Sequence, residues 1–261
     1  MRGTLSMKNL NDNAKSRGVL LFAYNTDSVD YVKIAERAAR LIEHNLKLPV
    51  TIITDMKSPQ TNERIGYKDG SQWFNGDRYR AYELSPYDET ILLDSDYLIL
   101  DDTLDKIVDT VDDYRIMTNN QSPTHSQDGD MGILSLHFVW ATVVVFKKTQ
   151  KAKQLFDLVG RIQRNYEYYI KLYNLREDNF RNDYAFSIAD NILSGYTHSK
   201  GIPWSMLTID NLVKNIETKN NKLIVREVDK AHVITRQNLH IMDKDYLLSD
   251  TYLTLVDEIC Q

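Results

Sequence analysis

The sequence predicts an α/β protein with a mostly parallel central sheet, and two observations carry that prediction. First, two short apolar runs, residues 18–24 and 50–54, flank a segment whose apolar side chains recur at helical spacing from Val32 to Leu46. A strand–helix–strand unit of this kind is typical of parallel strands joined by a right-handed crossover. Second, residues 90–93 form a third apolar run with the length of a buried strand.

The other elements follow in chain order. Ser28 or Asp27 is expected to cap the first helix, and Leu48-Pro49 ends it. Further helices are predicted over residues 78–84, 104–111, 155–170 and 184–193. Further strands are predicted over residues 138–146, 222–225 and 232–234, with long polar loops over 56–77 and 119–135. Because no linker-like segment interrupts this order, we expect a polar tail, residues 1–17, and one domain, residues 18–261.

Composition bounds the class of protein. Hydrophobic residues make up 42% of the 261 residues and charged residues 26%, which excludes wholesale disorder and a coiled coil. The only cysteine, Cys260, excludes an internal disulfide and fits a reducing compartment. The chain shows neither an apolar run that suits a bilayer nor a signal peptide at its N-terminus. We therefore expect a cytoplasmic protein without a membrane partner.

Charge is unevenly distributed along the chain, whose formal net charge is −5. Residues 83–113 hold eleven acidic side chains against one base, which suits the binding of a cation. The basic stretch from Lys147 to Arg181 holds nine bases against four acids, which suits contact with phosphates. Solvated helix faces explain both segments equally well.

The sharpest chemical signal is Asp94-Ser95-Asp96, which directly follows the predicted strand at residues 90–93. Ligands of parallel α/β sheets bind beyond the carboxyl ends of strands. In an extended chain the two carboxylates would lie on the same side, roughly 6.6 Å apart at Cα, where they could share a divalent cation. Because the acids lie at a strand end, replacing either with Ala is expected to leave the fold nearly intact. An acidic turn without a metal is the alternative.

The segment from Glu83 to Asp96 resembles the Asp-x-Asp region of glycosyltransferases with the GT-A fold, in the style of the glycogenin and lipopolysaccharide galactosyltransferase branch. Three further stretches resemble that branch in the same order. They are Val19-Leu-Leu-Phe-Ala-Tyr-Asn25, the bases Arg78 and Arg80, and Phe180-Arg-Asn-Asp183. The chain also resembles glycosyltransferase-like proteins of tailed phages, some of which modify hydroxymethylated bases of phage DNA.

This resemblance implies a single GT-A-like (Rossmann-like) domain that is a metal-dependent glycosyltransferase. The donor would be a nucleotide-diphosphate sugar, a UDP-sugar in this branch, with manganese or magnesium on its diphosphate. The implied metal ligands are Asp94, Asp96 and His240. The implied donor-binding residues are Tyr24, Asn25, Asp55, Arg78, Arg80, Ser95 and Lys244. Lys244 is the basic group nearest to His240, because the Gly-x-x-Lys-Pro-Trp sequence usual in that branch is absent.

The resemblance also assigns the chemistry. Asp183, together with Asn182, would orient the sugar or stabilise charge at its anomeric carbon. The branch implies retention of configuration. The acceptor hydroxyl could belong to a hydroxymethylated base of DNA, which would bind along the stretch from Lys147 to Arg181, in the host cytoplasm if the chain is phage-encoded.

Simpler explanations stay open for single residues, and other functions for the whole chain. Arg78 and Arg80 could instead form surface ion pairs, and at most one of the two arginines would reach a phosphate. His240 could be a half-buried structural histidine. Asp183 could cap a helix. A nucleotidyltransferase also uses Asp-x-Asp, but Gly70-Ser71 lies 94 − 71 = 23 residues before the acids. A non-catalytic nucleotide- or sugar-binding module is the third possibility, while the missing Gly-x-x-x-x-Gly-Lys pattern excludes a P-loop enzyme.

Overall fold

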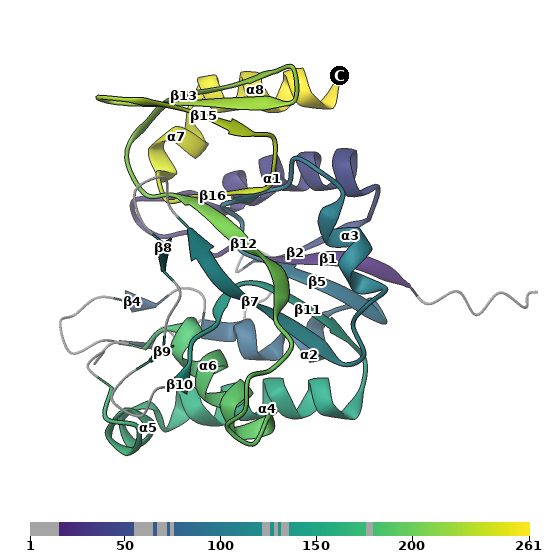
Figure 1. The fold of residues 1–261 in the computed structure, drawn as a ribbon, viewed down its shortest axis with the longest axis vertical. Helices are drawn as coiled ribbons and strands as arrows, with labels where there is room; N and C mark the ends of the chain where they lie inside the picture. The colour runs from purple at the N-terminus through teal and green to yellow at the C-terminus, as the bar shows by residue number, and fades with distance from the viewer. Residues whose placement is uncertain are drawn as a thin grey trace, which may run out of the picture.

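A computed structural model describes residues 16–54, 65–66, 72–73, 76–121, 126–127, 130–131, 136–175 and 180–261. Its centre is a mixed sheet with the strand order β2-β1-β5-β11-β7-β12-β16-β6, to which the short β8 adds beside β7 (Figure 1). Along that order the strands are β2 (Val50–Ile53), β1 (Arg17–Phe22), β5 (Glu89–Leu93), β11 (Trp140–Lys147), β7 (Tyr114–Gln121), β12 (Ile202–Ile209), β16 (Leu239–Ile241) and β6 (Tyr97–Leu98), with β8 (Ser126–Gln127) outside it.

Most strands of this sheet run in one direction. β1 pairs in parallel with both β2 and β5, and β12 pairs in parallel with both β7 and β16. Only β11 and β6 run the other way along the main path. The prediction of an α/β protein with a mostly parallel central sheet is therefore confirmed, as is the strand–helix–strand unit that opens it.

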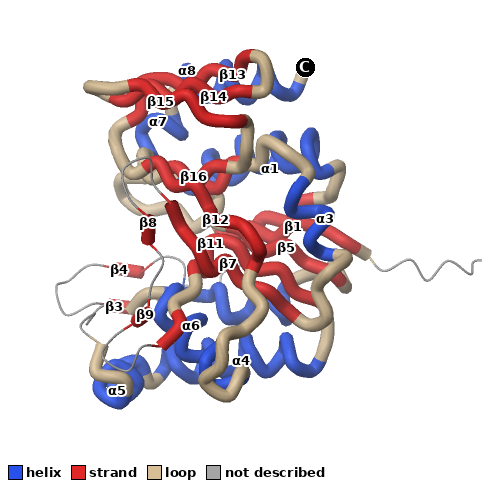
Figure 2. The backbone as a smooth tube through the Cα atoms, in the orientation of Figure 1, coloured by secondary structure: helices blue, strands red, loops and turns tan. Residues whose placement is uncertain are grey.

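Helices cover both faces of the sheet (Figures 1 and 2). The helices are α1 (Tyr31–Leu46), the 3-10 helix η1 (Gly76–Arg80), α2 (Ala81–Leu84), α3 (Thr103–Val108), α4 (Gln150–Arg164), α5 (Tyr166–Leu172), α6 (Asn182–Leu193), α7 (Lys244–Leu248) and α8 (Asp250–Cys260). Helices α1 and α3 pack on one face and α4 to α6 on the other.

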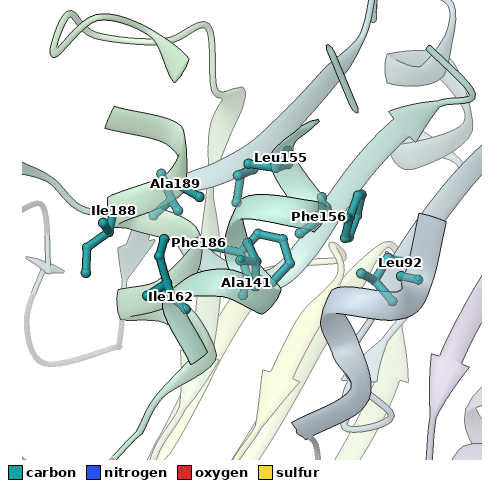
Figure 3. Packing of buried hydrophobic residues seen from close by; sticks show 14 of the residues in the cluster. Leu92, Ala141, Leu155, Phe156, Ile162, Phe186, Ile188 and Ala189 are labelled. Atoms are coloured by element: carbon teal, nitrogen blue, oxygen red, sulfur yellow. The ribbon is translucent and has the colours of Figure 1, made fainter. Parts of the chain in front are cut away.

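The buried strands contribute side chains to a core on each face of the sheet, because successive side chains of a strand point to opposite faces. Val19 and Leu21 of β1 join the core under α1 and α3, whereas Leu20 joins the core under α4 and α6. On the latter face, Leu92 of β5, Phe156 of α4 and Phe186 of α6 belong to one buried cluster, in which the centroids of the two rings are 5.7 Å apart (Figure 3). Burying both faces explains why these strands read as continuous apolar runs.

A three-stranded antiparallel sheet is inserted in the sequence between β12 and β16 of the central sheet. Its strands are β13 (Val213–Lys219), β14 (Lys222–Glu227) and β15 (Ala231–Thr235). It packs with α7 and α8 into a third core, at the end of the molecule where the chain finishes (Figure 1). Two-stranded pairs are formed by β3 (Ile65–Gly66) with β4 (Gln72–Trp73) and by β9 (Asp130–Met131) with β10 (Leu136–His137).

Several expected elements need correction. Strand β7 was not predicted, because the Asn and Gln side chains at its end are polar and lack the pattern of a buried strand. It extends through Gln121 into the loop expected over residues 119–135, which also contains β8 and β9. The expected long helix divides into α4 and α5 at Asn165. The cap of α1 is Asp30, whose carboxylate accepts a hydrogen bond from Lys33 N, and not Ser28 or Asp27. Helices α7 and α8 were also missed.

Candidate functional site

Asp94 and Asp96 lie in a tight turn at the carboxyl end of β5. The main chain of Asp94 donates to Thr142 O at 3.0 Å, and Tyr97 N donates back to Asp94 O at 3.1 Å. Ile241 N donates to Asp96 O at 3.1 Å, which ties the turn to β16. The extended geometry expected for these two acids is therefore wrong: a turn, and not a straight strand, brings their carboxylates together.

Asp94 has a buried cationic partner. Nη1 of Arg78 lies 2.5 Å from Oδ1 of Asp94, and the side chain of Arg78 is only 1% exposed. The same guanidinium donates to the main-chain oxygens of Leu93 and Ala141. These contacts orient the Asp94 carboxylate, whereas contact of Arg78 with a donor phosphate stays a prediction.

Asp96 has two cationic neighbours from the end of the chain. Nζ of Lys244 lies 2.5 Å from Oδ2 of Asp96, and Nε2 of His240 lies 3.5 Å from Oδ1. Asp96 as a whole is 8% exposed. The premise that both acids could be removed without cost to the fold is thus corrected for Asp96, because Ala would leave buried cationic groups without their carboxylate.

The structure brings together the three side chains expected to bind a metal. One ligand atom from each of Asp94, Asp96 and His240 lies within 4.8 Å of the others. His240 reaches the acids because β16 pairs with β6, placing His240 opposite Tyr97, the residue after Asp96. Residues far apart in the sequence therefore meet at the end of the central strands.

The pKa values of the two carboxylates are shifted in opposite directions. Burial raises the pKa of Asp94, and Arg78 offsets only part of that rise. Burial also acts to raise the pKa of Asp96, but Lys244 and His240 outweigh it and hold that pKa well below its usual range. Burial lowers the pKa of His240, and the carboxylates of Asp96 and Asp94 reverse this, so that the net shift is upward. Asp96 is the fixed negative charge of the site.

The donor set fits a divalent cation. Oδ1 of Asp96 is buried and has no hydrogen-bond partner within the described part of the chain, as expected for an oxygen kept for a ligand. Carboxylate oxygens suit manganese and magnesium, and the imidazole nitrogen of His240 favours manganese over magnesium, which takes oxygen ligands.

Asp183 lies beside this group. It belongs to the first turn of α6, where helix N-termini favour negative charge, although the N-cap residue itself is Arg181. Its Oδ1 accepts from Ala141 N at 2.9 Å and its Oδ2 accepts from Arg181 at 3.1 Å. Since Ala141 O accepts from Arg78, the main chain of Ala141 links Asp183 to Asp94. The neighbouring Asn182 is buried at 6% exposure.

The remaining donor-binding candidates are more dispersed. Tyr24 donates to Asp77 at 3.2 Å, and Oδ1 of Asn25 accepts from Val32 N at the start of α1. Arg80 lies 3.8 Å from Glu83. Ser95 is buried in the acidic turn, and Asp55 lies outside the described residues. For all of these, donor contact stays a prediction.

Three side chains near the site were missed from the sequence. Tyr31 opens α1, and its pKa is raised first by burial and further by Asp96 and Asp94, which keeps it a neutral phenol beside the acids. Thr208 contacts Nδ1 of His240, and Asn120 contacts Thr208. No spacing in the sequence relates Asn120 and Thr208 to His240, because the strand order of the sheet brings them together.

Most described bases of the stretch from Lys147 to Arg181 already have partners within the chain. Acidic partners bind Lys147, Lys153 and Arg181. Aromatic rings lie beneath the cationic groups of Lys148, Lys151 and Arg164. These contacts favour a structural role for much of this stretch.

No family model and no curated protein matches the chain. Solved structures of glycosyltransferases do match it, at low similarity. GlyE of Streptococcus pneumoniae TIGR4 is 16% identical with a TM-score of 0.38, over 68% of this chain and 43% of its own. Galactosyltransferase LgtC is 13% identical with a TM-score of 0.38, over 66% and 69%. Mouse xyloside xylosyltransferase 1 is 9% identical with a TM-score of 0.40, over 69% and 83%.

The chain spans less than half the length of GlyE and 36% of the bifunctional glycosyltransferase WbbM, which also matches. Among the helices that the structure describes, none has the length and hydropathy required to cross a membrane.

Proposed function

We propose that this chain is a metal-dependent glycosyltransferase of the GT-A type, which transfers a sugar from a nucleotide-diphosphate donor to an acceptor hydroxyl. The observation that carries the proposal is the convergence of Asp94, Asp96 and His240 within 4.8 Å at the carboxyl end of β5. This is the edge of a parallel α/β sheet at which ligands bind. Manganese is the preferred ion for these ligands, and a UDP-sugar is the donor that the sequence resemblance favours.

Each residue has a distinct part in the proposed reaction. The bound metal would supply Lewis acidity that offsets charge on the leaving nucleoside diphosphate. Asp94, Asp96 and His240 would hold that metal, and Arg78 fixes the Asp94 carboxylate. Lys244 adds a positive charge beside Asp96 for the diphosphate. Asp183 would face the sugar and stabilise positive charge that develops at the anomeric carbon.

The proposal is tested by donor hydrolysis. The full chain is incubated with a panel of nucleotide sugars and manganese, and the release of nucleoside diphosphate is measured with and without EDTA. Slow release that depends on both the metal and one class of donor supports the transferase. Tight donor binding without release would instead favour a non-catalytic binding module, and release of pyrophosphate from a nucleoside triphosphate would favour a nucleotidyltransferase.

Manganese affinity should fall as the pH falls through the raised pKa of His240. The protonated imidazole has no lone pair on Nε2, so the metal competes with a proton whose binding Asp96 and Asp94 favour. Below that pKa the affinity should decrease about tenfold per pH unit if one proton is displaced. Electron paramagnetic resonance of free Mn²⁺ over a pH series measures this.

The matched variant for the pH series is His240→Gln. It should bind Mn²⁺ more weakly, and the fall in affinity that the imidazole causes at lower pH should be absent. A wild-type affinity that is flat from neutral to acidic pH would show that His240 is no ligand.

The acceptor and the stereochemistry remain proposals from the sequence resemblance. A hydroxymethylated DNA base has little support from the basic stretch, because most of its described bases are engaged within the chain. Competition by DNA in the donor assay and NMR of the anomeric configuration of the product address these two points.

A further inference from the structure

Two buried polar side chains, Asn120 and Thr208, lie behind the acidic site without touching either carboxylate. Each is 6% exposed. They belong to β7 and β12, which come before β16 in the strand order of the sheet, and Thr208 lies directly opposite His240 in the parallel pairing of β12 with β16. Asn120, Thr208 and His240 thus form a row across three adjacent strands that leads to Asp96.

The hydrogen bonds of this row have a definite direction. The Thr208 hydroxyl donates to Oδ1 of Asn120 at 2.6 Å. A hydroxyl has one hydrogen, so Oγ1 of Thr208 is left as an acceptor for Nδ1 of His240, 3.2 Å away. Nδ1 therefore carries a proton, and Nε2 is the nitrogen that faces Oδ1 of Asp96 at 3.5 Å.

The Nδ1-protonated tautomer of His240 is not the one that the neighbouring carboxylates would favour by themselves. A neutral imidazole beside Asp96 would gain by placing its single proton on Nε2 and donating it to the acid. That tautomer would leave Nε2 without a lone pair for a cation. The Asn120–Thr208 bond counters it, because a buried Thr208 hydroxyl that already donates to Asn120 cannot also donate to Nδ1.

We propose that Asn120 and Thr208 are positioning residues that hold the proton of His240 on Nδ1 and so reserve Nε2 as the ligand for a divalent cation. The inference rests on the proposed cation site and adds to it the pair of residues that determines which imidazole nitrogen binds. Partners of this kind orient ligating histidines and fix their tautomer, and their loss typically weakens metal affinity about 10–100-fold.

The test compares Thr208→Val, Thr208→Ser and Asn120→Leu by Mn²⁺ titration with electron paramagnetic resonance detection. Thr208→Val keeps the shape but loses the hydroxyl, so it should bind Mn²⁺ about 10–100-fold more weakly, whereas Thr208→Ser should bind like the wild type. Asn120→Leu should weaken binding although residue 120 does not touch His240, because the freed hydroxyl can donate to Nδ1. The matched control is Thr90→Val, since Thr90 is also a buried threonine of the central sheet but bonds to Ser85.

Two further readouts separate this role from packing. In a His240→Ala background, Thr208→Val should cause no additional loss of Mn²⁺ affinity, because its effect passes through the imidazole. In metal-free protein in alkaline buffer, ¹⁵N NMR should show His240 protonated on Nδ1 in the wild type and shifted toward the Nε2 tautomer in Asn120→Leu.

The outcomes distinguish this inference from the proposed function. Unchanged Mn²⁺ affinity in Thr208→Val, or an Nε2-protonated His240 in the wild type, overturns the inference and leaves the cation site standing. If the wild type binds no Mn²⁺, the proposed function fails, and the NMR tautomer of His240 still decides whether the row acts as described.

Discussion

Replacing Asp96 by Asn should lower manganese-dependent donor turnover by about 10³-fold, because a Lewis-acidic metal contributes several kcal/mol to a reaction of this kind. Asn keeps the shape of the side chain and an oxygen that accepts from Lys244, but it removes the negative charge that attracts the cation. The loss should appear both in the rate of nucleoside diphosphate release and in Mn²⁺ affinity. Melting temperature is measured on the same preparation, because Lys244 loses the charge of its partner.

The control is Asp102→Asn, which removes a carboxylate of the same acidic segment at an exposed position. Asp102 pairs there with Lys106 at 2.8 Å. Its turnover should match that of the wild type. Asn is preferred to Ala at position 96, because Asn keeps an oxygen that can accept from Lys244, whereas Ala removes both the charge and the acceptor. Removing one partner of a buried ion pair costs about 3–5 kcal/mol, and such a loss would confuse loss of folding with loss of metal. Near-normal turnover in Asp96→Asn would remove this residue from the catalytic site.

Replacing Asp183 by Asn should reduce turnover about 10²-fold while donor affinity changes little. An electrostatic interaction that strengthens only as charge develops raises the rate without tightening ground-state binding. The substitution isolates charge from structure, because the Asn oxygen can still accept from Ala141 N, as Oδ1 of Asp183 does. Measurement of kcat, KM and melting temperature on one preparation separates the two effects.

The matched control lies on the same helix. Asp190 is 1% exposed and accepts from Tyr114 and Ser199. Asp190→Asn therefore removes a carboxylate of α6 that serves packing alone, and it should affect melting temperature more than turnover. If Asp183→Asn behaves in the same way, with a lowered melting temperature and nearly normal turnover, Asp183 serves only to hold β11 against α6.

The sequence predicts the parallel half of the sheet because its strands are buried on both faces and read as apolar runs. It does not predict β7, whose last four residues, Thr-Asn-Asn-Gln, are polar. One of them, Asn120, forms a hydrogen bond with Thr208 on the neighbouring strand β12, which the sequence pattern does not reveal. The same limit applies to the site. A residue pattern identifies Asp94 and Asp96, whereas the partnership of Asp94 with Arg78 depends on tertiary packing.

The pairing of β16 with β6 has a consequence for biosynthesis. Asp96 and Lys244 are separated by 148 positions, and a ribosome that adds about 5–20 residues per second needs roughly 7–30 s to traverse that interval. During this time β5 and its acidic turn exist on a nascent chain that has neither His240 nor Lys244. The proposed cation site therefore becomes complete late, after β16 and Lys244 have been translated, and a prematurely terminated chain would carry the acids without the imidazole or the ammonium group.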